Sequence, residues 1–83
     1  MEGQIVYSKA GRDKGTFLVV VGESEDVLLV CDGKKRPLER PKPKNRKHVA
    51  VTKTILEKRQ FSTNKSLRGT LASLRGEGLK EEL

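Results

Sequence analysis

Basic side chains dominate the residues of this sequence that could bind or react. Eleven Lys and Arg residues lie in 34–59 against two acids, whereas residues 1–33 carry three bases and six acids. The densest part, Arg40–His48, holds five bases in nine residues and no acid. Prolines in and before this part favour an extended PPII chain that would space the bases along a line. Such a segment suits a polyanion, with nucleic acid as the first candidate and an anionic membrane as the second.

Catalytic and metal-binding chemistry finds little support in the residue types. The chain has one cysteine, Cys31, and one histidine, His48. Together they cannot complete a tetrahedral metal site, and a lone cysteine cannot form an internal disulfide. His48 has no nucleophile or acid at motif spacing, so we expect it to be structural or one more polar contact. We expect no enzyme activity, no cofactor and no metal.

The most informative segment is Ser8-Lys9-Ala10-Gly11-Arg12-Asp13-Lys14-Gly15, called here the glycine loop. Gly11 and Gly15 allow the positive φ angles of tight turns, and Asp13 could accept hydrogen bonds from nearby backbone amides. Its three bases would then project from a rigid platform. The alternative is a structural turn with solvated charges. A nucleotide-binding P-loop is excluded, because the glycine spacing is one position short and no Lys follows Gly15.

A family resemblance rests on this loop and its flanks. The run from Gln4-Ile5-Val6 through the glycine loop to Phe17-Leu18-Val19-Val20 resembles a KOW motif, with its central glycine at Gly11 or Gly15. The continuation through Asp32-Gly33-Lys34, Arg36-Pro37-Leu38 and Pro41–His48 is similar to bacterial KOW-domain RNA-binding proteins, relatives of archaeal and eukaryotic large-subunit ribosomal proteins. The resemblance covers residues 3–53. It implies an SH3-like barrel that binds RNA through its loops.

The sequence predicts that strands position these residues in the first part of the chain and that a helix follows near its end. Short β-branched runs predict strands over 4–7, 16–21, 27–31 and 48–52. Asp32-Gly33 predicts a type I′ hairpin turn with a returning strand over 34–38, which the following prolines would end. About five short strands joined by tight turns favour a small β-barrel over a sandwich. We therefore expect a mainly β fold.

A helix should follow the barrel. Ser62, Thr63 and Asn64 are N-cap candidates, and Leu67, Leu71 and Leu74 recur on one helical face. Gly76 is a candidate for the residue just past the helix, and residues 77–83 should fray. The sequence thus divides into a barrel domain, 1–53, and a C-terminal helical extension, 54–83. The leucine stripe could serve a protein partner if the barrel does not bury it.

Aromatic residues are scarce, which bears on the kind of RNA. Of the three, Phe17 is expected in the core, and Tyr7 could lie inside or outside. Since single-strand binders stack bases on exposed aromatics, the sequence favours folded RNA, with ribosomal RNA as the first candidate. The N-terminus lacks the pattern of a signal peptide, and no apolar run is long enough to span a membrane. We expect a cytoplasmic monomer without membrane contact.

The prediction is a non-catalytic RNA-binding protein. Its expected RNA contacts are Lys9, Arg12, Lys14, Lys34, Lys35, Arg36, Arg40, Lys42, Lys44, Arg46, Lys47 and His48, with Gly11, Asp13 and Gly15 shaping the glycine loop. Two alternatives stay open. The first is a protein-interaction module that docks on ribosomal or transcription components. The second is sequence-neutral DNA binding.

Overall fold

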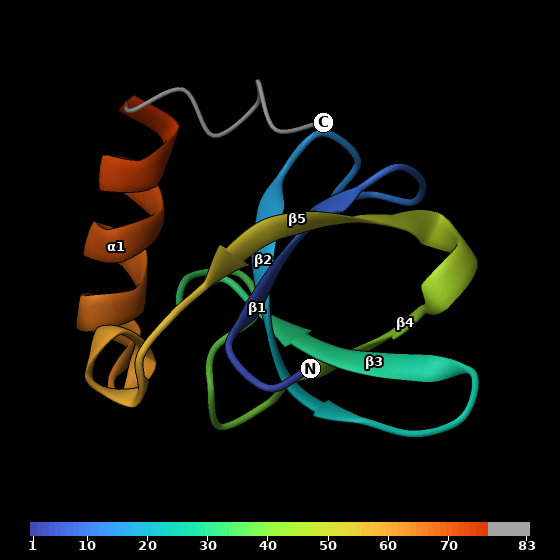
Figure 1. The fold of residues 1–83 in the computed structure, drawn as a ribbon, viewed down its shortest axis with the longest axis horizontal. Coiled ribbons are helices and arrows are strands. Elements are labelled where there is room, and N and C mark those ends of the chain that lie inside the picture. Colours follow the sequence, from blue (N-terminus) through green and yellow to red (C-terminus); the bar gives the residue numbers. More distant parts are fainter. Residues whose placement is uncertain (77–83) are drawn as a thin grey trace.

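One antiparallel sheet and one α-helix make up the fold of residues 1–76, which are the residues that this computed structural model describes (Figure 1). The strands are β1 (Gln4–Ser8), β2 (Phe17–Glu23), β3 (Val27–Cys31), β4 (Lys42–Asn45) and β5 (Val49–Ile55), in the order β4-β3-β2-β1-β5. Two 3-10 helices, η1 (Arg46–His48) and η2 (Lys58–Phe61), flank β5, and α1 (Asn64–Gly76) follows. The predicted mainly β fold with a C-terminal helix is confirmed.

The sheet curls without closing. Its two outer strands, β4 and β5, stand at opposite ends of the strand order, so the barrel is an open one (Figure 1). The strand register shifts between Val20 and Gly22 in β2 and between Gln4 and Val6 in β1. Such irregularities bend strands and increase their twist, which lets a five-stranded sheet wrap around a small interior.

Both faces of the central strands are buried, because alternate side chains enter two different cores. Inside the curl lie the buried side chains Val6, Leu18, Val20, Leu28, Val30 and Val49. On the outer face, Ile5, Phe17, Val19 and Cys31 pack with Leu56 and with Leu67 and Leu71 of α1. The period-two alternation of β1 and β2 thus serves the barrel and the helix at once.

Helix α1 covers the outer face of the sheet. It begins where the Thr63 side chain accepts a hydrogen bond from the Ser66 amide at 3.0 Å, as an N-cap residue does. Leu67 and Leu71 are buried and Leu74 is half-buried, so the leucine stripe predicted from the sequence belongs to the protein's own core. Gly76, expected just past the helix, is the last residue of α1. Our expectation for 77–83 lies outside the described residues. No helix within residues 1–76 is long and apolar enough to cross a membrane.

The fourth strand was predicted in the wrong place. Residues 34–38 belong to a loop, called here the β3–β4 loop (residues 32–41), and the strand is Lys42–Asn45. The Asp32 carboxylate accepts hydrogen bonds from the amides of Lys34 at 2.8 Å and Arg36 at 2.9 Å, which holds the chain in a local turn instead of a ladder. Of Asp32 and Gly33, only Gly33 has a positive φ, at 80°, whereas a type I′ turn needs a positive φ at both central residues.

Pro43 lies inside β4, although the sequence suggested that the prolines would end a strand over 34–38. It pairs with Leu29 of β3. Among residues 1–76, β4 is an edge strand, and an edge strand tolerates a residue without an N–H because one side of its ladder is not used in the sheet. The stretch from Lys42 to Asn45 is therefore a paired strand and not a free PPII segment.

Candidate nucleic-acid interface

The glycine loop has the backbone that the sequence predicted. Gly11 and Gly15 have φ angles of 87° and 90°, in the left-handed region that favours glycine. The loop closes through two backbone hydrogen bonds of 2.9 Å, from Gly15 N to Ser8 O and from Ser8 N to Thr16 O. Its bases, Lys9, Arg12 and Lys14, are all exposed. The loop is thus a fixed support for three positive charges.

Asp13 shapes this loop by a different contact from the one expected. Its Oδ1 accepts hydrogen bonds from the Ser8 hydroxyl at 2.9 Å and from the Lys44 ammonium, and not from backbone amides. Lys42 Nζ lies 3.8 Å from Oδ2. Burial alone would raise the pKa of the Asp13 carboxyl. The hydrogen bonds from Lys44 and Ser8 and the charges of Lys44 and Lys42 outweigh it, so the pKa is lowered.

Lys44 is consequently an interior residue. Its side chain is 5% exposed, and its ammonium donates to Ala10 O at 2.6 Å as well as to Asp13. Lys42 is half-buried beside the same carboxylate. The sequence placed both lysines among the RNA contacts. Because the ammonium of Lys44 faces into the protein, it does not belong to the candidate surface.

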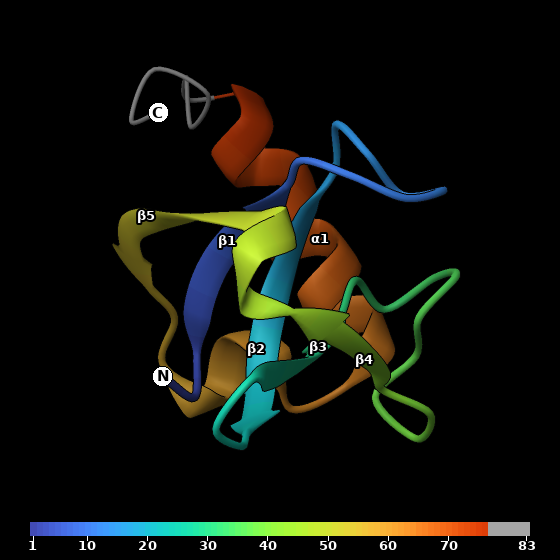
Figure 2. The ribbon, with the colours of Figure 1, turned by 90° about the vertical axis from the view of Figure 1, so that its right-hand side faces the viewer.

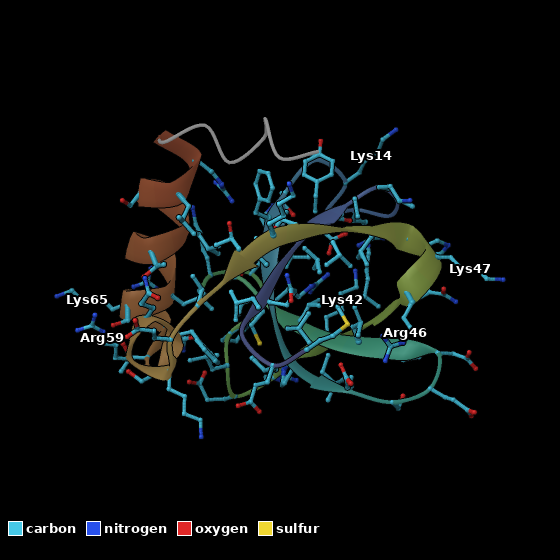
Figure 3. The ribbon with its side chains drawn as sticks, in the orientation of Figure 1. Lys14, Lys42, Arg46, Lys47, Arg59 and Lys65 are labelled. Atoms are coloured by element: carbon cyan, nitrogen blue, oxygen red, sulfur yellow. The ribbon has the colours of Figure 1, made fainter. Side chains whose placement is uncertain are left out.

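Arg46 is also committed to the protein's own structure. Its guanidinium donates to the carbonyls of Glu25 at 2.9 Å and Ser24 at 2.7 Å, and lies 3.9 Å from the Glu23 carboxylate. These contacts stabilise the turn between β2 and β3. Lys47, the next residue of η1, instead points away from the ribbon, as Lys14 does (Figure 3). Within η1, then, the exposed contacts are Lys47 and His48.

Three basic elements meet at one side of the sheet. The Lys9 amide donates to His48 O at 2.8 Å, which joins the glycine loop to η1. Arg12 of the glycine loop and Lys35 and Arg36 of the β3–β4 loop line a common hollow of about 400 Å³. The two loops project from the same side of the molecule (Figure 2). The exposed members of the predicted set are Lys9, Arg12, Lys14, Lys34, Lys35, Arg40, Lys47 and His48.

Arg36 lines this hollow and a second one at the β3–β4 loop. It is half-buried, and the second hollow, of about 480 Å³, is also lined by Lys35, Arg40 and Lys42. Its Nε is buried and has no hydrogen-bond partner within residues 1–76. Buried donors are normally paired, so this atom is an exception among the described residues.

One group of acidic side chains lies away from the loop bases. Glu23, Glu25 and Asp26 lie at the turn between β2 and β3, where the N-terminal amine of Met1 contacts Glu23 at 3.0 Å. On the side of the loops, Asp13 and Asp32 also line the hollow at Arg12, but the exposed bases outnumber these two acids, so this side attracts anions.

The aromatic side chains do not form a stacking platform. Phe17 is fully buried, as predicted, and Tyr7 meets it edge-on with ring centroids 5.1 Å apart. Tyr7 and Phe61 are half-buried against the core between the sheet and α1. This surface is therefore equipped for phosphates and not for unstacked bases.

Two bases of α1 extend the surface and were missed from the sequence. Arg68 and Arg75 line a hollow of about 310 Å³ together with Lys34 and Lys35 of the β3–β4 loop. Their seven-residue spacing runs beside the leucine stripe, one position further along the chain. That offset was the available signal, because a helix that buries its leucines carries these neighbours along the margin of its buried face.

The described residues contain neither a metal-ligand cluster nor a reactive thiol. Within 1–76, no group of three His, Cys, Asp or Glu side chains is arranged to hold a metal ion. Burial, with the charges of Asp32 and Glu39, raises the pKa of the Cys31 thiol to about 11. The thiol therefore stays protonated and weakly nucleophilic at neutral pH.

Comparison of the chain with models of known protein families gives no match, and comparison with curated protein sequences gives none either.

Proposed function

We propose that this protein is a non-catalytic KOW-domain RNA-binding protein that contacts the backbone of folded RNA, with ribosomal RNA as the first candidate. The single observation that carries the proposal is the meeting of the glycine loop, η1 and the β3–β4 loop, which brings seven exposed Lys and Arg side chains and His48 onto adjoining elements. The sequence similarity of residues 3–53 to KOW proteins supports it, as does the absence of exposed aromatic side chains from this surface.

Electrostatic binding to phosphates gives the proposal a quantitative test. Each neutralised phosphate should contribute about 0.7 to 0.9 to the slope of log K against log salt, so four to seven contacts predict a slope of roughly −3 to −6. Titration of a fluorescein-labelled RNA hairpin at several salt concentrations measures it. A slope near zero would contradict the proposal. Competition by duplex DNA of the same sequence separates folded-RNA binding from sequence-neutral DNA binding.

A protein-interaction module is the second candidate, and one observation favours it. Val51 and Ile55 on the edge strand β5 are 54% and 66% exposed. The leucine stripe of α1 does not add to this case, because the sheet buries Leu67 and Leu71. Co-purification of a ribosomal or transcription protein that resists ribonuclease would favour docking. We propose that either activity operates in the cytoplasm.

A further inference from the structure

We infer that α1 is part of the RNA-binding surface, and that the groove between α1 and the β3–β4 loop holds a stretch of RNA backbone between Arg68 and Arg75 on one wall and Lys34 and Lys35 on the other. The inference rests on the proposed function and adds to it a role for the C-terminal helix, which the sequence resemblance does not cover.

The groove is continuous with the surface already described. Lys35 lines all three basic hollows, and Thr16 and Asp32 line both the hollow at Arg12 and the hollow at α1. A polyanion lying against the glycine loop therefore reaches α1 by crossing Lys35. Figure 2 shows both loops on one side of the sheet, with α1 behind them.

The two walls of the groove are fixed to each other. Asn64 at the start of α1 accepts a hydrogen bond from the Leu38 amide at 2.8 Å and donates to both carboxylate oxygens of Glu39 at 2.8 and 3.0 Å. Gly33 approaches α1 so closely that a Cβ there would lie 2.6 Å from Asn64 O. Because the walls are joined before any ligand arrives, little ordering is needed on binding.

Arg68 is held ready for a phosphate. Its Nη1 donates to Gly33 O at 2.8 Å, which anchors the guanidinium at the wall of the groove. That bond uses one of five N–H donors, so a pair remains for two phosphate oxygens. Arg75 stands two helical turns further on, about 10 Å along the axis. Ala72 lies between them, exposed and too short to fill the groove.

The charges of the groove are not neutralised by the protein within residues 1–76. Lys34, Lys35, Arg68 and Arg75 form no ion pair there. The one acid that lines the groove is Asp32, whose Oδ1 accepts the amides of Lys34 and Arg36. Four cations against one engaged carboxylate give the groove a net positive charge that suits a phosphate backbone.

The opposite face of α1 supplies matched controls. The hollow on that face is lined mostly by polar residues and by a single base, Lys65. Figure 3 shows Lys65 pointing away from the sheet. Lys65 and Arg75 are both exposed and lie on the same helix. Ser73 lies on the Lys65 side and directly follows Ala72, and both are exposed. A pair of variants, one on each face, therefore changes the net charge by the same amount and alters the same helix.

The first experiment titrates the fluorescein-labelled RNA hairpin with Arg75→Gln and Lys65→Gln. Loss of one charge-assisted contact should weaken binding about tenfold for Arg75→Gln. The salt slope should also fall by about 0.7 to 0.9, while Lys65→Gln stays near wild type. The Arg75 side chain makes no hydrogen bond or ion pair within residues 1–76, so its replacement should leave the fold intact. Lys14→Gln tests the glycine loop in the same assay.

The second experiment changes the groove without removing a base. Ala72→Glu should weaken binding at least as much as Arg75→Gln, because it adds an acid between the two arginines, whereas Ser73→Glu should have a much smaller effect. Equal loss of affinity in Ala72→Glu and Ser73→Glu would overturn the role of α1. So would unchanged binding by Arg75→Gln in an assay where Lys14→Gln loses affinity. Either result would leave RNA binding by the loops in place. Failure of the wild type to bind the hairpin would instead overturn the proposed function, and this inference with it.

Discussion

Asp13, Lys42 and Lys44 form an ion cluster beneath the glycine loop. Loss of Asp13 and loss of Lys44 should lower the stability of the protein by different amounts. Asp13→Asn removes the negative charge while keeping the shape of the side chain. Lys44, whose side chain is 5% exposed, then retains only neutral acceptors, with the ammonium of Lys42 close by. Removing one partner of a buried pair costs about 3 to 5 kcal/mol, and Asp13 is 12% exposed, so about 3 kcal/mol is expected. For a domain of this size the melting temperature should fall by roughly 12 to 24 °C.

The reciprocal variant should be milder. In Lys44→Met, Asp13 keeps the Ser8 hydroxyl and the Lys42 ammonium, so the loss should be about 1 to 2 kcal/mol. The double variant Asp13→Asn/Lys44→Met leaves no buried charge unpaired and should be more stable than Asp13→Asn alone. Urea and thermal unfolding followed by circular dichroism at pH 7 measure all three free energies. A loss smaller for Asp13→Asn than for Lys44→Met would refute the reasoning.

The same cluster should determine how the stability of the fold falls at acid pH. The pKa of Asp13 is lowered in the folded protein, so its contribution is complete above the unfolded value near 3.8 and is lost as the pH falls through the folded value. The wild type should therefore lose stability steeply below about pH 4. Asp13→Asn should show a shallower loss in that range, measured as melting temperature against pH.

The remaining predictions concern a lysine pair, the thiol and two glycines. Lys44→Met should leave the salt slope of RNA binding unchanged while Lys14→Met reduces it by about 0.7 to 0.9; equal slopes would place Lys44 on the binding surface. Cys31, buried and with a pKa near 11, should resist iodoacetamide at pH 7.5 until the protein unfolds, as mass spectrometry would show. Gly33→Ala should destabilise by about 2 kcal/mol or more, because of its positive φ and the close approach of Asn64 O. A Cβ on Gly69 would have no atom within 4 Å, so Gly69→Ala should stabilise α1 by about 1 kcal/mol. Similar melting temperatures for the two glycine variants would contradict both predictions.

Local sequence patterns predicted most of the elements. Short β-branched runs located β1, β2 and β3, alternation located β5, and the leucine spacing located α1, because these signals depend on neighbours in the sequence. The fourth strand was misplaced because the Asp32 carboxylate accepts the amides of Lys34 and Arg36 and holds a local turn, a side-chain contact that the Asp-Gly hairpin rule does not include.

The candidate site was predicted less completely than the fold. Counting charges marked Arg40–His48 as the main contact, but strand formation turned Lys44 inward to a carboxylate 31 residues earlier, and Arg46 fastened a distant turn. The leucine pattern of the helix gave no indication of Arg68 and Arg75, which face the β3–β4 loop only after the helix packs on the sheet. Sequence composition reports how many charges a segment holds, and only the packing of the chain determines which of them face the solvent.

The proline in β4 makes the two open edges of the sheet unequal. β4 is four residues long and carries a residue without an N–H at its second position, so it is a poor template for another strand. β5 is seven residues long, contains no proline, and exposes Val51 and Ile55 on either side of Lys53. Unwanted association between copies should therefore proceed through β5, with Lys53 as the charge that opposes it. The colloidal behaviour of this basic protein thus depends on one lysine of one edge strand as well as on its net charge.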